Sequence, residues 1–185
     1  EHTLVVALIS GGGSALFPKP AGDLTLADKQ HMTDLLLKAG ADITEINTVR
    51  KHISAIKGGQ LARHASPATL VSLILSDVVG DPLDAIASGV TVCDHTTYAD
   101  ALAVLERYQL RETAPKAIVA HLQAGADGQI AETPKAGDAI FERTHNILLG
   151  TNLVCLKACE QKARALGYQT LILSARIEGE TRDIA

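Results

Sequence analysis

Three short runs of apolar residues are the strongest structural signal in the chain. They cover residues 3–9, 69–75 and 168–173, and each contains β-branched residues and is followed by polar residues. Runs of this length and composition predict strands that are buried on both faces, as in parallel sheets. A shorter apolar run, at residues 146–149, lies just before a predicted helix.

Between these runs, apolar residues recur at the three- and four-residue spacing of amphipathic helices. A first helix begins at the capping pair Thr25 and Asp28 and ends at Gly40, and a second covers residues 43–56, before Gly58. Further helices are predicted over residues 60–65, 99–108, 115–124 and 152–166. Because strands alternate with helices, the predicted fold class is α/β, with a mainly parallel sheet and right-handed crossovers.

Composition and charge limit the classes of partner. The chain has 185 residues, of which 46% are hydrophobic and 21% are charged, as in a soluble globular domain. Its 17 basic and 21 acidic side chains give a net charge of −4, which argues against nucleic acid because phosphate backbones attract basic surfaces. No apolar run reaches the length of a membrane span. Three cysteines without metal-type spacing fit a reducing compartment, so we expect a cytoplasmic protein.

The loop after the first apolar run is a candidate phosphate site. It reads Ser10, Gly11, Gly12, Gly13 and Ser14. Consecutive glycines allow left-handed backbone conformations, in which several N–H groups point at one anion. The loop matches neither the P-loop pattern nor the G-x-G-x-x-G pattern of dinucleotide sites. The alternative is a tight exit from a strand, made of small residues.

Two carboxylates follow the second apolar run. Asp77 and Asp81 lie four residues apart at the predicted carboxyl end of a strand, where α/β proteins bind ligands. Such a pair can hold Mg²⁺, or one member can accept a proton from a substrate hydroxyl. The alternative is a pair of turn-forming residues. Close behind them, the small residues Ser88 and Gly89 allow a ligand to approach the backbone.

A short basic stretch lies at the end of the second predicted helix. The spacing of Asn47, Arg50 and Lys51 places them on one helix face, and Lys57 follows just before a pair of glycines. An arginine fork beside a lysine suits a carboxylate or a phosphate. The alternative is an ordinary solvated helix face.

Taken together, these motifs resemble those of the MOFRL-type glycerate kinases, also called glycerate 2-kinases. The resemblance rests on ISGGGSAL at 9–16, EINTVRKHIS at 45–54, IKGG at 56–59, LSDVVGD at 75–81 and IASG at 86–89. It implies a Rossmann-like three-layer α/β/α sandwich and a two-domain enzyme that phosphorylates D-glycerate to 2-phosphoglycerate with ATP and Mg²⁺. Some bacterial relatives have carried the label hydroxypyruvate reductase. Val90 departs from the family pattern, which usually has proline there.

The residues and the resemblance together assign roles to these motifs. Ser10 to Ser14, with Ser88 and Gly89, are the predicted ATP-binding residues. Asn47, Arg50, Lys51 and Lys57 are the predicted substrate-binding residues, of which Arg50 and Lys51 are also candidate catalytic residues. Asp77 and Asp81 are the predicted magnesium ligands or catalytic carboxylates, without a division of roles between them.

The chain also resembles only part of the family's enzyme. It starts at Glu1 without methionine and enters an apolar run at once. We therefore expect residues 1–185 to be the central and later part of the family's larger N-terminal domain, truncated at both ends, with the C-terminal MOFRL domain absent. Strand edges left uncovered in such a piece favour homodimerisation.

Two other functions stay open at this stage. One is an NAD(P)-dependent hydroxypyruvate reductase, which needs a dinucleotide fingerprint that residues 10–14 do not supply. The other is a non-catalytic module that only binds nucleotide. We expect D-glycerate and a nucleotide as ligands, and neither nucleic acid nor a membrane as a partner.

Overall fold

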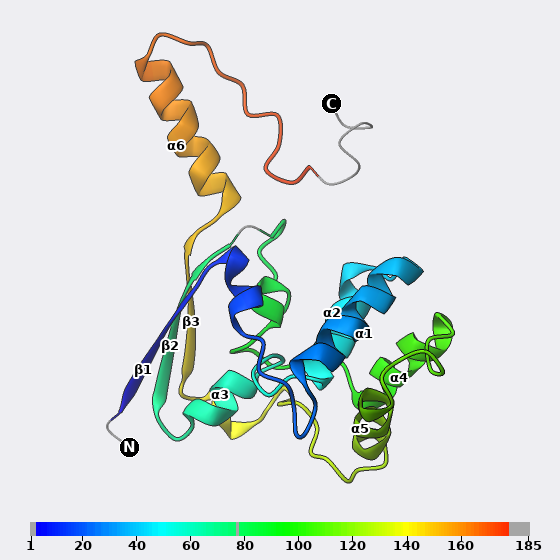
Figure 1. Ribbon diagram of the computed structural model, residues 1–185. Helices are drawn as coiled ribbons and strands as arrows, with labels where there is room; N and C mark the ends of the chain where they lie inside the picture. The colour runs from blue at the N-terminus through cyan, green and yellow to red at the C-terminus, as the bar shows by residue number, and fades with distance from the viewer. Residues whose placement is uncertain (1–2, 77, 178–185) are drawn as a thin grey trace.

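A parallel sheet of three strands lies at one side of the molecule (Figure 1). The structure is a computed structural model that describes residues 3–76 and 78–177. The strands are β1 (Leu4–Ile9), β2 (Thr69–Leu75) and β3 (Thr144–Gly150), in the order β1-β2-β3. Leu70 in β2 pairs with Val5 in β1 and with Thr144 in β3, and both pairings are parallel. The predicted α/β class and parallel sheet are therefore confirmed.

Helices lie between and after the strands, close to where the spacing predicts them. The helices are α1 (Leu26–Ala39), α2 (Ile43–His52), α3 (Gln60–Ala65), α4 (Tyr98–Arg107), α5 (Lys116–Ala126) and α6 (Asn152–Ala165), with short 3₁₀ turns η1 (Gly11–Leu16), η2 (Ile86–Ser88) and η3 (Ala139–Phe141). The predicted capping box of Thr25 and Asp28 starts α1. Within residues 3–76 and 78–177, no helix is both long and apolar enough to cross a bilayer.

Two details of the prediction are wrong. The second helix ends at His52 rather than at residue 56, because Ile53 leaves helical geometry with φ of −107° and ψ of 18°. Residues 168–173 form no strand, because α6 leads away from the sheet and carries them away from β3 (Figure 1). The run at 146–149, to which no element was assigned from the sequence, is the middle of β3.

The expected burial of strands on both faces is also wrong for β1. Leu4, Val6 and Leu8 alternate along the strand and are 60%, 52% and 76% exposed. The opposite face of the sheet packs on a small cluster formed by Ile9, Ile74 and residues around η2. Because apolar side chains line the exposed face as well, the sequence pattern alone did not distinguish one buried face from two.

The largest core lies among the helices rather than against the sheet. Met32, Leu36, Val49, Leu105 and Ile118 are fully buried there and come from α1, α2, α4 and α5. These helices gather beside the sheet, with η1 and η2 between them and the strands (Figure 1). The last turn of α2 therefore lies close to the loop that follows β1, and this is the region where the functional residues meet.

Candidate functional site

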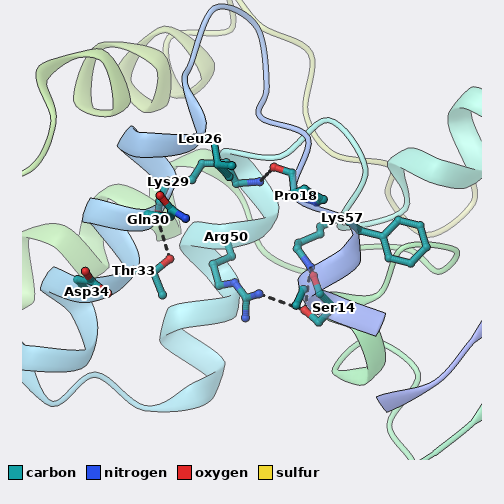
Figure 2. Close-up of a pocket in the computed structure, with 11 residues that line it drawn as sticks. Ser14, Pro18, Leu26, Lys29, Gln30, Thr33, Asp34, Arg50 and Lys57 are labelled. Carbon is teal, nitrogen blue, oxygen red and sulfur yellow. Dashed lines mark hydrogen bonds between the residues drawn. The ribbon is translucent and has the colours of Figure 1, made fainter. Parts of the chain in front are cut away.

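A cavity of about 370 Å³ lies where η1, α1 and the end of α2 come together (Figure 2). Its size is within the range of small-molecule sites. It is lined by Ser14, Ala15, Phe17, Pro18, Leu26, Lys29, Gln30, Thr33, Asp34, Arg50 and Lys57. The lining includes apolar side chains such as Phe17 and Leu26 and three cationic ones, Lys29, Arg50 and Lys57.

Ser14 is the point at which two predicted motifs meet. The Lys57 ammonium donates hydrogen bonds to the Ser14 carbonyl oxygen at 3.0 Å and to its Oγ at 2.8 Å. Arg50 Nη2 donates to the same Oγ at 3.1 Å (Figure 2). The structure therefore brings together the end of the glycine-rich loop and two of the predicted substrate-binding cations.

Lys29 is a third cation in this cavity, and sequence analysis missed it. It is only 8% exposed, and its ammonium donates to the carbonyl oxygens of Pro18 at 2.9 Å and Lys19 at 3.3 Å. The signal was present in the sequence, because Lys29 lies three residues before Met32 on the apolar face of α1. A lysine at such a position has to leave its charge at a surface or in a cavity.

Burial lowers the pKa of all three cations, and neighbouring positive charge lowers it further for the two lysines. Burial lowers the pKa of Lys57 to about 7, with further lowering from Arg50 and Lys29, and burial together with Arg50 lowers the pKa of Lys29 to about 8. Burial also lowers the pKa of Arg50. Among the described residues, none of the three forms an ion pair with a carboxylate. The site thus holds positive charge at an energetic cost that an anionic ligand would remove.

Asn47 holds Arg50 rather than lining the cavity. Its Oδ1 accepts hydrogen bonds from Arg50 Nη1 at 3.4 Å and from Ser88 Oγ at 3.3 Å. Ser88 is buried and lies in a backbone segment with positive φ, together with Ala87 and Gly89. Asn47 and Ser88, both predicted to contact ligands, therefore contact each other and fix the arginine from behind.

Gly89 has a similar supporting position. Its carbonyl oxygen accepts a hydrogen bond from the Gly59 N–H at 2.7 Å, and the Ser88 carbonyl accepts one from Gly58 at 3.0 Å. A Cβ on Gly59 would lie 2.8 Å from the Val92 carbonyl oxygen, and its φ is +80°. Glycine is therefore required at position 59, and the loop at η2 fixes the turn directly after Lys57.

Lys51 lies away from the cavity. Its ammonium is 3.3 Å from Asp94 Oδ1, and both side chains are buried. Asp94 also accepts hydrogen bonds from the backbone N–H and hydroxyl of Thr96 and from the hydroxyl of Thr133. Burial raises the pKa of Asp94, but Lys51 and Thr96 outweigh this effect and hold the pKa below its usual value. The structure thus separates Lys51 from Arg50 and gives its charge a partner.

The glycine-rich loop does not have the expected backbone. Gly12 and Gly13 belong to the 3₁₀ turn η1, and neither has a positive φ. The Gly13 N–H donates to the Ser10 carbonyl oxygen at 2.8 Å, as in an ordinary turn. The left-handed arrangement of N–H groups that motivated the phosphate prediction is therefore absent at these two glycines.

The carboxylate pair is described only in part. Asp77 lies outside the described residues. Asp81 has a φ of +55° and lines a separate cavity of about 110 Å³ with Thr151 and Arg176. In the part of the chain that the structure describes, no group of three His, Cys, Asp or Glu side chains could hold a metal ion. Of the predicted carboxylate pair, the structure thus places only Asp81, in this separate cavity.

Comparison with known proteins places the chain among relatives of known name. A family described as a domain of unknown function, DUF4147, matches residues 1–123. The chain is 46% identical over 183 residues to "Glycerate 2-kinase" of Pyrococcus horikoshii, which covers 99% of this chain and 41% of that protein. It is 49% identical over 183 residues to "Putative hydroxypyruvate reductase" of Agrobacterium vitis, covering 98% and 39%.

A solved structure gives the same result. The crystal structure of glycerate kinase from Thermotoga maritima matches with a TM-score of 0.78 and 39% identity, over 94% of this chain and 39% of that chain. The fold and the sequence therefore point to one group of proteins. The chain spans about two fifths of the length of these relatives.

The buried pair of Lys51 and Asp94 leads to a stability prediction. Asp94→Ala leaves the Lys51 ammonium buried without its partner, so we expect the full-length protein to lose about 3 kcal/mol or more of stability in urea denaturation. The exposed Asp23 provides a matched control, and Asp23→Ala is expected to change stability by less than about 0.5 kcal/mol. The double variant Lys51→Met with Asp94→Ala is expected to lose less than the sum of its two single changes. Equal losses for Asp94→Ala and Asp23→Ala would contradict this assignment.

Proposed function

Because the chain belongs to the family described as a domain of unknown function, DUF4147, and has named glycerate kinases among its relatives, we propose that the protein containing it is a glycerate kinase. It transfers a phosphoryl group from ATP, with Mg²⁺, to the C2 hydroxyl of D-glycerate and forms 2-phosphoglycerate. The observation that carries the proposal is the cavity that Lys29, Arg50 and Lys57 line, with Arg50 and Lys57 both bonded to Ser14.

The chemistry of this cavity fits phosphoryl transfer. In such reactions negative charge is spread over the phosphoryl oxygens, and the protein contributes mainly by positioning and by electrostatic stabilisation. Arg50 and Lys57 donate hydrogen bonds toward this charge, and Asn47 fixes the arginine fork. The reaction forms a bond from the glycerate oxygen to phosphorus and breaks the bond from phosphorus to the oxygen that leaves with ADP.

The remaining predicted roles belong to the same proposal. Asp77 or Asp81 accepts the proton of the glycerate hydroxyl, and the other holds Mg²⁺, which neutralises phosphate charge when bound. Ser10 to Ser14 contact the nucleotide. Ser88 and Gly89 support the site through the turn that follows Lys57, according to their hydrogen bonds. We assign Lys51 a supporting position as well, because Asp94 already neutralises it.

The proposal extends to the setting of the protein. Cys93, Cys155 and Cys159 are free thiols, which fits a cytoplasmic enzyme. The exposed apolar side chains of β1 fit contact with a further surface, either within the same protein or in a homodimer.

A direct assay distinguishes this function from its alternatives. The full-length protein is incubated with D-glycerate, ATP and Mg²⁺, and separately with hydroxypyruvate and NADH. We expect formation of 2-phosphoglycerate in the first reaction and no oxidation of NADH in the second. Oxidation of NADH without phosphorylation would assign the reductase activity, and no turnover in either reaction would leave a nucleotide-binding role as the better explanation.

Replacing Arg50 tests the site itself. Arg50→Ala removes a charge-assisted contact to the transferring group, so kcat/KM for glycerate is expected to fall roughly 30-fold or more. This corresponds to a loss of about 2 kcal/mol of transition-state stabilisation. Lys38→Ala removes an exposed charge at the end of α1 and serves as the control, with kcat/KM expected within twofold of the unmodified enzyme. A change of less than threefold in Arg50→Ala would remove Arg50 from the mechanism.

A further inference from the structure

The cavity offers more positive charge and more hydrogen-bond donors than a single carboxylate can use. We propose that Lys29, Arg50, Lys57 and Ser14 form a subsite for a phosphoryl group, that Lys29 is an essential part of it, and that the glycerate carboxylate binds elsewhere. This inference rests on the proposed function, because it assigns a class of ligand to the same cavity. It goes further by naming Lys29 and by excluding one of the two anions of the reaction.

Counting donors supports a phosphoryl ligand. A lysine ammonium has three N–H donors, and both Lys29 and Lys57 use two of them in hydrogen bonds to the protein, which leaves one on each. Arg50 uses two of its five, which leaves three. Among the described residues these donors have no other partner. They exceed what the two oxygens of a carboxylate accept, whereas a phosphoryl group presents three terminal oxygens.

The hydroxyl of Ser14 is already oriented for the same ligand. Its Oγ accepts hydrogen bonds from Arg50 and from Lys57, which occupies both lone pairs. The Ser14 hydroxyl proton is therefore left to donate. Neither Arg50 nor Lys57 can accept it, so a bound anion is the acceptor that fits. Phe17 and Leu26 line the cavity beside these donors, so part of the wall is apolar. A wall of low polarity strengthens the attraction between the cations and a bound dianion.

The balance of charge points in the same direction. Lys29 and Asp34 from α1 and Arg50 from α2 are the charged groups that line the cavity around Lys57, while the lining residues of η1 carry no charge. Asp34 is exposed and forms no ion pair with the three cations among the described residues. A monoanion would therefore leave much of the charge uncompensated, whereas a phosphoryl dianion compensates most of it.

This arrangement makes binding dependent on pH. The pKa of Lys57 is lowered to about 7 and that of Lys29 to about 8, so both amines are partly neutral at pH 8 in the free protein. A bound dianion favours the charged amines and raises both pKa values, so binding at pH 8 takes up protons from solution. The affinity for a phosphoryl ligand is accordingly expected to fall as the pH rises from about 7 to above 8.

Calorimetry on the full-length protein tests the proposal with three probes. These are tripolyphosphate for the phosphates of a nucleotide, 2-phosphoglycerate for a phosphorylated acid, and D-glycerate for a carboxylate alone. Lys29→Gln removes the charge and retains an amide that can donate to the carbonyls of Pro18 and Lys19. Lys29→Arg retains the charge, and Lys38→Gln is the control on the same helix.

We expect Lys29→Gln to weaken the binding of tripolyphosphate, 2-phosphoglycerate or both by about tenfold or more, and that of D-glycerate by less than twofold. Lys29→Arg is expected to restore most of the loss, and Lys38→Gln to have no effect. Measured at pH 8 in two buffers of different ionisation enthalpy, phosphate binding should take up protons in the unmodified protein and fewer in Lys29→Gln. The phosphate probe that is weakened identifies which source of phosphate occupies the subsite.

Two results would overturn the inference: unchanged binding of both phosphate probes in Lys29→Gln, or an equal loss of affinity for D-glycerate. The melting temperature of each variant is measured alongside, and if Lys29→Gln is unfolded, the comparison is made with Lys29→Met. If the protein phosphorylates glycerate but gives either result, the proposed function stands and the proposed subsite is wrong. If the protein shows the expected binding but no kinase activity, the subsite stands and the proposed function is wrong.

Discussion

The burial of three cations, Lys29, Arg50 and Lys57, in one cavity is the constraint that governs this site. Three cationic side chains line one cavity, and within the described part of the chain none has a carboxylate partner. Burial and mutual repulsion both oppose the charged forms of the two lysines. A fold keeps such an arrangement only if other contacts offset its cost. The same cost makes the cavity favourable for an anion, because binding relieves it.

The rest of the structure supplies those contacts. Ser14 lies in η1, which follows β1, and its oxygens accept hydrogen bonds from Arg50 and Lys57. Asn47 accepts a hydrogen bond from the arginine, while the turn that follows Lys57 donates hydrogen bonds to carbonyls of the loop at η2. These contacts link segments that lie far apart in the sequence. Long-range packing between the sheet and the helical core therefore determines the geometry of the cavity.

The sequence predicted the parallel sheet and most of the helices, because periodicity carries that information. It marked Arg50, Lys57 and the loop after β1 as separate candidates, and only the family resemblance put them in one active site. The sequence placed Lys51 beside Arg50, although consecutive helical residues point in directions about 100° apart. Lys51 instead pairs with Asp94, 43 residues later. Lys29 lies visibly on the apolar face of α1, but its place in the cavity could not be predicted, because its two acceptors are backbone carbonyls that no side-chain pattern records. Residues 168–173 have strand-like composition, but a strand also needs a neighbour, and composition does not show whether one is within reach.

Titration of the lysine side chains by NMR is the most direct test of the charge crowding. In the full-length protein with isotope-labelled lysine, the signals of Lys29 and Lys57 can be assigned from the Lys29→Gln and Lys57→Gln variants. Burial and charge crowding predict a midpoint of about 7 for Lys57 and about 8 for Lys29 in the free protein, both moving upward when tripolyphosphate is added. Midpoints near the ordinary lysine value of about 10.4 for both side chains in the free protein would contradict this prediction.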